Sequence, residues 1–411
     1  MSTVTGFDPF AAEVIDDPYP YYRRLRDEAP VCWIEEDDLW MVTRYDDVAA
    51  VLHDPATFSS ADGMGALMSG RVGRRRIDAR GLFGLDMREL RVLIATDPPD
   101  HTRLRRLLSR AFTPRAIAEL EPHLRQVCAE LVDDLLAAAA SGTGDLVAQL
   151  AFPFPVVVIA ELLGIPPVRR DDFKRWSDAL VGALSGNWNP AEAQQTLAEM
   201  VMYLADVVER RRHEPGDYLI SRLVAGADPD DPDSLSPAEI TLFAVLLLVA
   251  GNETTTNLVG NGAAALAAHP DQAALLRSQP DLLGPAIEEV LRWDAPVHGL
   301  FRSTTRPVNL AGADLPAGAM VLVSFAAANR DSRHFPDADR FDIARRPSDR
   351  LAFGHGIHYC LGASLARLEA RLVGETLATR GVRLQPAPGA RRVDSMILRG
   401  FASFPVTATA R

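Results

Sequence analysis

Apolar residues recur at helical spacing along most of the chain, and this pattern predicts a mainly α-helical protein. The longest pattern begins at Ser236-Pro237-Ala238-Glu239, a capping box with a proline suited to the first helical turn. It continues to Pro270, so we expect a helix over about residues 237–268, roughly 45–50 Å long. A further helix is expected from Leu361 to Thr379. A minor β region is expected near the N-terminus and around Val297 to Val323.

The middle of the long helix breaks its own apolar pattern. The segment Ala250-Gly251-Asn252-Glu253-Thr254-Thr255-Thr256 follows directly on a run of leucine and valine residues. Glycine and consecutive threonines are poor residues for a helix interior, and a carboxylate among apolar side chains costs free energy unless it is paired. Such a conflict at the centre of a helix predicts a functional site. The alternative is a solvated helix face.

A lone cysteine follows a glycine-rich run near the C-terminus. Residues 353–362 read Phe-Gly-His-Gly-Ile-His-Tyr-Cys-Leu-Gly, so Cys360 stands where the next helix begins. Unpaired backbone N–H groups and the helix dipole favour a thiolate there, and thiolates are metal ligands. A single thiolate with open space around it suits haem iron better than zinc. The alternatives are a buried structural cysteine and a zinc hydrolase that uses His355, His358 and Cys360.

Composition excludes some classes of function. The chain has 411 residues, 47% hydrophobic and 24% charged, without a linker, repeat or low-complexity tract, so one domain over residues 1–411 is expected. A net charge of −12 disfavours nonspecific nucleic-acid binding. There is no Walker A or Gly-x-Gly-x-x-Gly pattern, so a redox enzyme with this sequence would take its electrons from another protein.

The sequence also bears on location. Cys32, Cys128 and Cys360 are scattered and form no Cys-x-x-Cys pair, which is typical of a reducing compartment. The N-terminus lacks the apolar core of a signal peptide, and the longest apolar run, Leu242 to Gly251, is shorter than the ~20 residues of a membrane span. We therefore expect a cytoplasmic protein without a membrane anchor.

The run around Cys360 resembles the haem-ligand loop of cytochromes P450, and the likeness to the soluble bacterial type extends from about Tyr19 to Val406. The resemblance implies the cytochrome P450 fold, with haem b as cofactor and Cys360 as the iron ligand. It implies that Phe353, Gly354 and Gly362 help to form the haem-binding loop over residues 353–362.

The same resemblance gives the broken segment of the long helix a role in oxygen activation. Ala250 and Gly251 would leave room for dioxygen beside the haem. Glu253 would relay protons from solvent, and Thr254 would hydrogen-bond the bound oxygen.

Further motifs match the family's haem and structural contacts. His101 and Arg105 are four residues apart on one helix face, and together with Arg302 and His355 they would bind the haem propionates. For His358 a surface or loop-stabilising role is at least as well supported. Glu289, Arg292 and Arg345 would form a buried structural triad that holds the cysteine loop, with Glu288 as an exposed neighbour.

The resemblance implies a monooxygenase that inserts one atom of O2 into a lipophilic small molecule, by hydroxylation or epoxidation, in secondary or xenobiotic metabolism. Electrons would come from a ferredoxin or flavodoxin with its NAD(P)H-dependent reductase. One alternative is a peroxide-driven enzyme of the same fold, which would not need the Glu-Thr pair. Another is a noncatalytic protein that binds haem or a carrier protein.

An apolar substrate pocket is also implied, although ordinary core packing would explain any single residue in it. The expected lining residues are Leu82, Phe83, Leu85, Leu247, Ala250, Val297, Leu300, Ile397 and Leu398.

Two groups of arginines allow more than one interpretation. The group Arg71, Arg74, Arg75, Arg76 and Arg80 forms either a solvated loop or a site for an anionic substrate or carrier protein. A second group would dock an acidic ferredoxin or form ion pairs with Asp337, Asp339, Asp342 and Asp349. Its members are Arg333, Arg345, Arg346, Arg350, Arg367 and Arg371.

Overall fold

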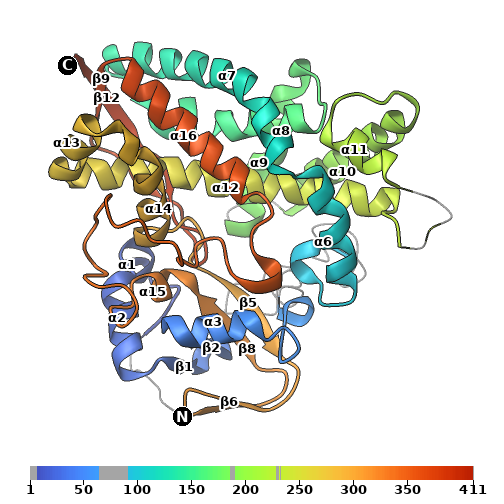
Figure 1. Ribbon diagram of the computed structural model, residues 1–411, viewed down its shortest axis with the longest axis vertical. Helices are drawn as coiled ribbons and strands as arrows, with labels where there is room; N and C mark the ends of the chain where they lie inside the picture. The colour runs from blue at the N-terminus through green and yellow to red at the C-terminus, as the bar shows by residue number, and fades with distance from the viewer. Residues whose placement is uncertain (1–6, 64–90, 186–189, 228–230, 232, 411) are drawn as a thin grey trace.

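Helices dominate the structure, a computed structural model that describes residues 7–63, 91–185, 190–227, 231 and 233–410 (Figure 1). The mainly α prediction is confirmed. The α-helices of the described residues are α1 (Ala12–Asp16), α2 (Tyr19–Glu28), α3 (Tyr45–His53), α6 (Asp100–Ala111), α7 (Pro114–Ala140), α8 (Pro153–Leu162), α9 (Arg170–Ser185), α10 (Pro190–His213), α11 (Leu219–Ala225), α12 (Pro237–Ala268), α13 (Pro270–Ser278), α14 (Leu283–Trp293), α15 (Phe325–Asn329) and α16 (Ala363–Thr379).

The long helix α12 has the bounds that the sequence predicted. Its capping box is complete, because the Glu239 backbone N–H donates to the Ser236 hydroxyl at 3.2 Å and the Ser236 N–H donates to the Glu239 carboxylate at 2.9 Å. Figure 1 shows α12 crossing the molecule, with α16 alongside it. By length and composition alone α12 could span a membrane, yet 67% of its most apolar stretch is buried inside the protein. Its apolar surface therefore belongs to the core.

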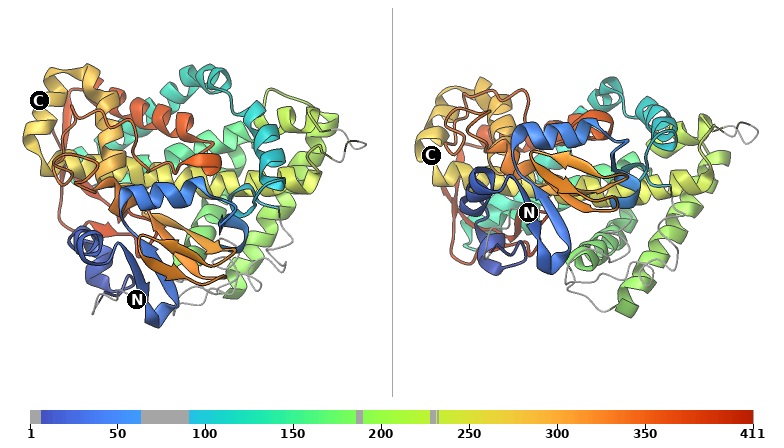
Figure 2. Two further views of the ribbon diagram at one scale, coloured as in Figure 1. Left: turned by 60° about the horizontal axis from the view of Figure 1, so that its bottom comes forward. Right: turned by 90° about the horizontal axis from the view of Figure 1, so that it is seen from below.

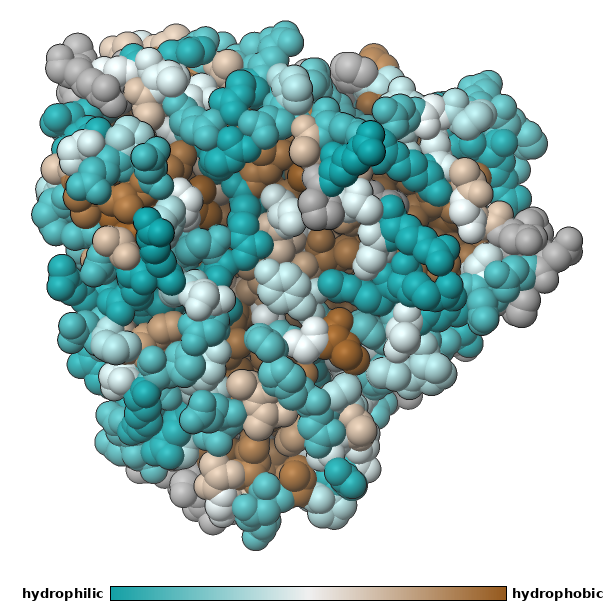
Figure 3. All heavy atoms as spheres, viewed as in Figure 1, coloured by the Kyte–Doolittle hydropathy of each residue, from teal (hydrophilic) through white to brown (hydrophobic). Residues whose placement is uncertain are grey.

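The largest apolar cluster lies around α12. Leu248 of α12, Phe154 of α8, Phe173 of α9 and Leu204 of α10 are each fully buried in it. Helices α7 and α16 contribute further residues to the same cluster. Burial of this apolar surface is what holds the helices against one another. Figure 3 shows one face of the molecule, largely covered by hydrophilic residues with hydrophobic patches between them.

A smaller β region lies on one side of the helical part (Figure 2). The main sheet has the order β1-β2-β8-β5-β3, in which only the β2–β8 pair is parallel. The strands β1, β2, β5 and β8 fall where the sequence predicted a β region. The strands of the described residues are β1 (Val31–Ile34), β2 (Leu39–Val42), β3 (Phe58–Ser59), β4 (Gly144–Asp145), β5 (Gly299–Thr304), β6 (Val308–Leu310), β7 (Ala313–Leu315), β8 (Met320–Ser324), β9 (Val382–Pro386), β10 (Arg391–Arg392), β11 (Phe401–Ser403) and β12 (Pro405–Ala410).

Candidate functional site

The glycines of the cysteine loop are required by its path. Gly354 and Gly356 have φ angles of +68° and +66°, a conformation that side chains with a Cβ rarely adopt. A Cβ atom on Gly356 would lie 2.5 Å from the backbone oxygen of Leu52 in α3. The loop therefore packs closely against α3, and Gly356 allows that approach.

Cys360 closes this loop. Its backbone N–H donates to the Phe353 carbonyl at 2.9 Å, and the Gly362 N–H bonds to the thiol sulfur. Burial nevertheless raises the pKa of Cys360 and outweighs both this hydrogen bond and the nearby charges of Arg105 and Arg367. The Gly362 N–H thus favours the thiolate, as expected, although burial favours the thiol in the protein by itself. Helix α16 begins at Ala363 instead of Leu361, because Leu361 and Gly362 still belong to the loop.

A cluster of four basic side chains lies near the cysteine. His101 and Arg105 come from α6, Arg302 from β5, and His358 from the cysteine loop. His101 is 2% exposed, and neither of its ring nitrogens has a hydrogen-bond partner among the described residues. The His358 ring lies 4.2 Å from that of His101, centroid to centroid, and its Nε2 is also buried without such a partner. Burial lowers the pKa of Arg105, and the charge of Cys360 opposes that shift, so the cluster and the thiol are within electrostatic reach.

The pKa values of this cluster indicate a shortage of negative charge around it. Burial lowers the pKa of His358 to about 3, with further contributions from Arg302, His101 and Arg105. Burial likewise lowers the pKa of Arg302 to about 10, opposed by the single carboxylate of Asp97. Asp97 in turn accepts hydrogen bonds from the Ser59 hydroxyl at 2.5 Å and the Ser60 N–H at 2.9 Å. Two arginines and two imidazoles with unused nitrogens therefore fit a group that carries two carboxylates, as haem does.

His355 is not part of this cluster. It is exposed, its Nδ1 accepts a hydrogen bond from the Gly356 N–H at 3.0 Å, and its ring lies 4.4 Å from that of His53 in α3. The structure thus places His358 where the sequence analysis expected His355. The described residues also contain no group of three or more His, Cys, Asp or Glu side chains able to hold a metal ion, which contradicts the zinc alternative.

The middle of α12 presents one open side. Ala250 is exposed and Thr254 half-buried, although most of their helical neighbours are buried. The Thr254 hydroxyl donates to the Ala250 carbonyl at 2.7 Å, and Glu253 is 7% exposed. A Cβ atom on Gly251 would lie 2.9 Å from Cδ1 of Ile159, so this glycine allows α8 to approach α12.

The remaining polar residues of this segment bond to neighbouring elements. The Thr255 hydroxyl donates to Glu369 of α16 at 3.1 Å, and the Thr256 hydroxyl donates to the Ala151 carbonyl at 3.0 Å. Asn252 donates from Nδ2 to the Ser177 hydroxyl of α9 at 2.5 Å. Because these residues are buried, the solvated-face alternative is wrong. Ser177 and Glu369 carry no motif that sequence reasoning could have recognised.

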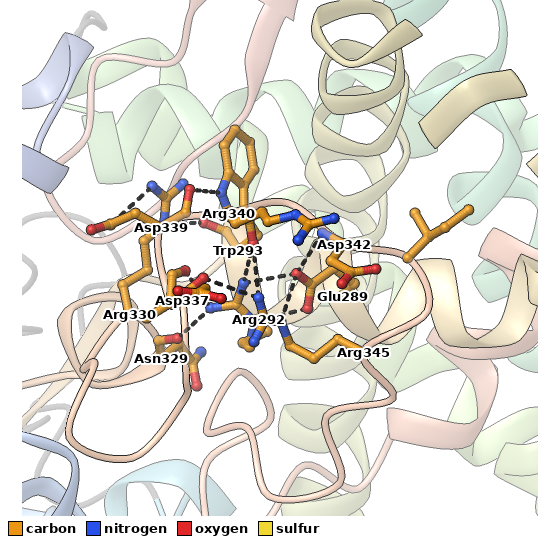
Figure 4. Close-up of polar contacts among 12 residues, drawn as sticks. Glu289, Arg292, Trp293, Asn329, Arg330, Asp337, Asp339, Arg340, Asp342 and Arg345 are labelled. Atoms are coloured by element: carbon orange, nitrogen blue, oxygen red, sulfur yellow. Dashed lines mark hydrogen bonds and ion pairs between the residues drawn. The ribbon is translucent and has the colours of Figure 1, made fainter. Parts of the chain in front are cut away.

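Glu289, Arg292 and Arg345 meet in a buried ion-pair group (Figure 4). Arg292 makes two bonds of 2.8 Å to Glu289, and both side chains are 0% exposed. The Arg345 Nε donates to the same carboxylate at 3.2 Å. Arg292 also donates to the carbonyls of Asn329 and Ala338, at 2.9 and 2.8 Å. The group therefore fixes the path of the chain between α15 and the cysteine loop.

Glu288 differs from its expected role as an exposed neighbour. Its side chain is 23% exposed and forms ion pairs with Arg350 and, at 2.7 Å, with Arg367 of α16. The Arg367 guanidinium lies 4.5 Å from the ring centroid of Phe353. Glu288 thus connects α14 to the cysteine loop and to α16.

The arginines considered for ferredoxin docking are mostly paired, but not with the expected aspartates. Arg333 pairs with Asp27 at 2.7 Å and with Asp331, and Arg371 pairs with Glu121 at 2.7 Å and with Glu375. The other pairs, made by Arg345, Arg350 and Arg367, use Glu289 or Glu288, as described above.

The expected pocket residues lie in several places. Leu82, Phe83 and Leu85 and the arginines between 71 and 80 lie outside the described residues. Leu247 is 8% exposed in the core cluster around α12. Val297 forms an isolated antiparallel bridge with Leu398, and the neighbouring His298 N–H donates to the Ile397 carbonyl at 2.8 Å. Leu398 lines a narrow cavity together with Tyr22. Leu300 and Ile397 are half-buried beside the main sheet.

Known proteins were compared with the chain as a whole. The family model for cytochrome P450 matches residues 21–398. The vitamin D(3) 25-hydroxylase of Pseudonocardia autotrophica is 42% identical over 98% of both chains. The 6-deoxyerythronolide B hydroxylase of Saccharopolyspora erythraea is 38% identical over 99% of both. The solved structure of cytochrome P450 CYP109Q5 from Chondromyces apiculatus is 37% identical, covers 98% of both chains and superposes with a TM-score of 0.87.

Proposed function

This chain belongs to the cytochrome P450 family, whose members bind haem b and act as monooxygenases, and we propose which of its residues carry that function. Cys360 ligates the iron, and its loop is held by the Phe353 carbonyl and the close approach of Gly356 to α3. A bound iron would stabilise the thiolate that burial disfavours in the protein alone, and the thiol proton would pass to solvent.

The propionates are bound by His101, Arg105, Arg302 and His358. The single observation that carries this assignment is that ring nitrogens of His101 and His358, beside the buried Arg302, have no hydrogen-bond partner in the part of the chain that the structure describes. Burying two carboxylates there would give each donor a partner and offset the positive charge of the arginines. In this assignment His355 stays outside the haem contacts.

Proton delivery is assigned to the open side of α12. Haem, when bound, supplies the binding and activation of dioxygen. The Thr254 hydroxyl lies at this side, where it donates a hydrogen bond to the Ala250 carbonyl. Glu253 is buried in the same turn of the helix. Glu253 directly precedes Thr254 in the sequence, and its carboxyl can relay protons from solvent toward this side of the helix.

The substrate class is a bulky lipophilic molecule. The relatives named above act, by their names, on vitamin D(3) and on 6-deoxyerythronolide B. Their identity over nearly the whole chain supports hydroxylation of a secosteroid- or macrolide-like skeleton here. Electrons come from a ferredoxin or flavodoxin with its reductase, and the protein works in the cytoplasm.

A spectral and turnover experiment tests this function. The reduced, carbon monoxide-bound protein should show the red-shifted absorption band of a thiolate-ligated haem, and Cys360→His should lose that band. With NADPH, a ferredoxin and its reductase, vitamin D(3) and 6-deoxyerythronolide B should be screened for hydroxylated products. Product formed with hydrogen peroxide but not with NADPH and a reductase would favour the peroxide-driven alternative. Haem binding without product under either condition would favour the noncatalytic one.

A further inference from the structure

A chain of buried hydrogen bonds crosses three elements beside Glu253. Asn252 is 0% exposed, and its bond to Ser177 of α9 is 2.5 Å long. The Thr256 hydroxyl lies 3.4 Å from Asn252 Oδ1 and donates to Ala151 at 3.0 Å. Ala151 ends a π-helical segment, Val147–Ala151, that precedes α8. The bonds therefore connect α12 to α9 and to the start of α8.

The surroundings of these bonds are apolar. Phe173 and Trp176 of α9 and Leu248 of α12 are each 0% exposed in the same core cluster. Leucine at positions 252 and 177 would satisfy the demand for burial without any hydrogen bond. A polar pair buried in such a place is stable only in the geometry that satisfies it, so it specifies how two helices meet.

Three contacts within two turns fix how α12 is rotated about its axis. Gly251 packs against Ile159 of α8, Asn252 bonds to α9, and Thr255 bonds to α16. Neighbouring residues of an α-helix point about 100° apart. Residues 251, 252 and 255 therefore lie within about 100° of one another around the axis, so the contacts hold one side of the helix, and Ala250 and Thr254 lie on the side left open.

Thr254 follows the rotation of the helix. Its hydroxyl is bonded to the carbonyl of Ala250 one turn earlier, at 2.7 Å, so the side chain moves together with the backbone. Among the three contacts, the Gly251 contact with Ile159 is apolar and has no preferred direction. The Asn252 and Thr255 bonds are both directional and buried, and the Asn252 bond is the shorter, at 2.5 Å against 3.1 Å, so we expect it to be the more sensitive to rotation.

We propose that Asn252 is a positioning residue of the oxygenation reaction. Through its bond to Ser177 it sets the rotation of the central turns of α12 and so the direction of the Thr254 hydroxyl on the open side of the helix. This inference rests on the proposed function of Thr254. Asn252 itself does not touch the reacting atoms.

The test uses the reduced, haem-loaded protein with carbon monoxide as the probe. The infrared C–O stretching band reports on the polar groups next to the bound ligand, and it needs no substrate. Thr254→Val should shift this band, and Asn252→Leu should shift or broaden it as well. Ser177→Ala, a smaller change, should act in the same direction. In the double variant Asn252→Leu with Thr254→Val, the band should lie where Thr254→Val alone places it.

Asn261→Leu is the matched control. Asn261 is also a fully buried asparagine of α12, and it donates to the carbonyls of Asp294 and Arg399, both at 2.9 Å. Its loss should lower thermal stability without moving the C–O band. If Thr254→Val moves the band while Asn252→Leu and Ser177→Ala do not, the positioning role is overturned. If Thr254→Val leaves the band unchanged, the proposed function of Thr254 fails instead.

Discussion

Two histidines three residues apart in the cysteine loop have different neighbours. His358 turns inward beside His101, whereas His355 turns toward His53 and solvent. The left-handed Gly356 between them redirects the chain, so spacing along the sequence does not show which ring faces the cofactor. The resemblance to a family identified the loop, but only the fold separates the roles of its two histidines.

Removing each histidine in turn should separate them by haem affinity. His358→Ala should weaken haem binding roughly five- to tenfold, since a buried hydrogen bond contributes about 1–1.5 kcal/mol. His355→Ala should leave haem affinity close to that of the wild type. The rate of haem transfer from each variant to an excess of apomyoglobin measures the difference. Equal transfer rates for the two variants, or faster loss from His355→Ala, would contradict the assignment.

Most of the polar residues that interrupt the apolar pattern of α12 form hydrogen bonds to neighbouring elements. The bond from Thr255 to Glu369 joins α12 to α16, the helix that follows the cysteine loop. Burial raises the pKa of Glu369 to about 8, so this carboxyl is mostly protonated at neutral pH. The structure thus places a neutral acid between the two helices, and its ionisation should weaken their contact.

Replacing Glu369 by glutamine should change how stability depends on pH. The folded-state pKa lies above the unfolded value, so the wild type loses stability as pH rises from about 4.5 through about 8. Glu369→Gln cannot ionise, and its melting temperature relative to the wild type should rise from pH 5 to pH 9. Glu375→Gln is the matched control on the same helix, because its ion pairs with Arg371 and Arg125 lower the pKa of that carboxyl. Its difference from the wild type should stay constant over this range. Parallel melting curves for Glu369→Gln and the wild type would rule out a buried neutral acid.

Elements were predictable from the sequence where their signals are local. The capping box and the apolar period gave the bounds of α12, and the start of α16 differed by two residues because the loop continues past Cys360. The C-terminal strands were missed: β12 pairs with β9, which precedes it by about twenty residues, and also with the two-residue β4, more than 250 residues away. The cluster around His101 likewise joins α6, β5 and the cysteine loop, and nothing in the local sequence shows that they meet.

At the scale of the molecule, the buried pair of Glu289 and Arg292 connects segments that are distant in sequence. Arg292 holds the carbonyls of Asn329 and Ala338, and the Asn329 side chain accepts a bond from the Leu351 N–H at 2.7 Å. Leu351 lies two residues before Phe353, where the cysteine loop begins. The ion pair therefore positions the metal-binding loop indirectly, through the segment between α15 and α16.

Breaking this pair should affect the whole molecule. Arg292→Met would leave the Glu289 carboxylate buried with only Arg345 as its charged partner, and removing one partner of a buried ion pair costs about 3–5 kcal/mol. We expect a strongly lowered melting temperature, little soluble protein and poor haem incorporation. Arg115→Met is the control, because Arg115 is 91% exposed and its pair with Glu119 lies at the surface, where such pairs contribute about 0–1 kcal/mol. Melting temperature and haem content per purified chain measure both variants. Similar losses in the two would mean that burial of the Glu289–Arg292 pair, although complete in the structure, does not determine the stability of the cysteine loop.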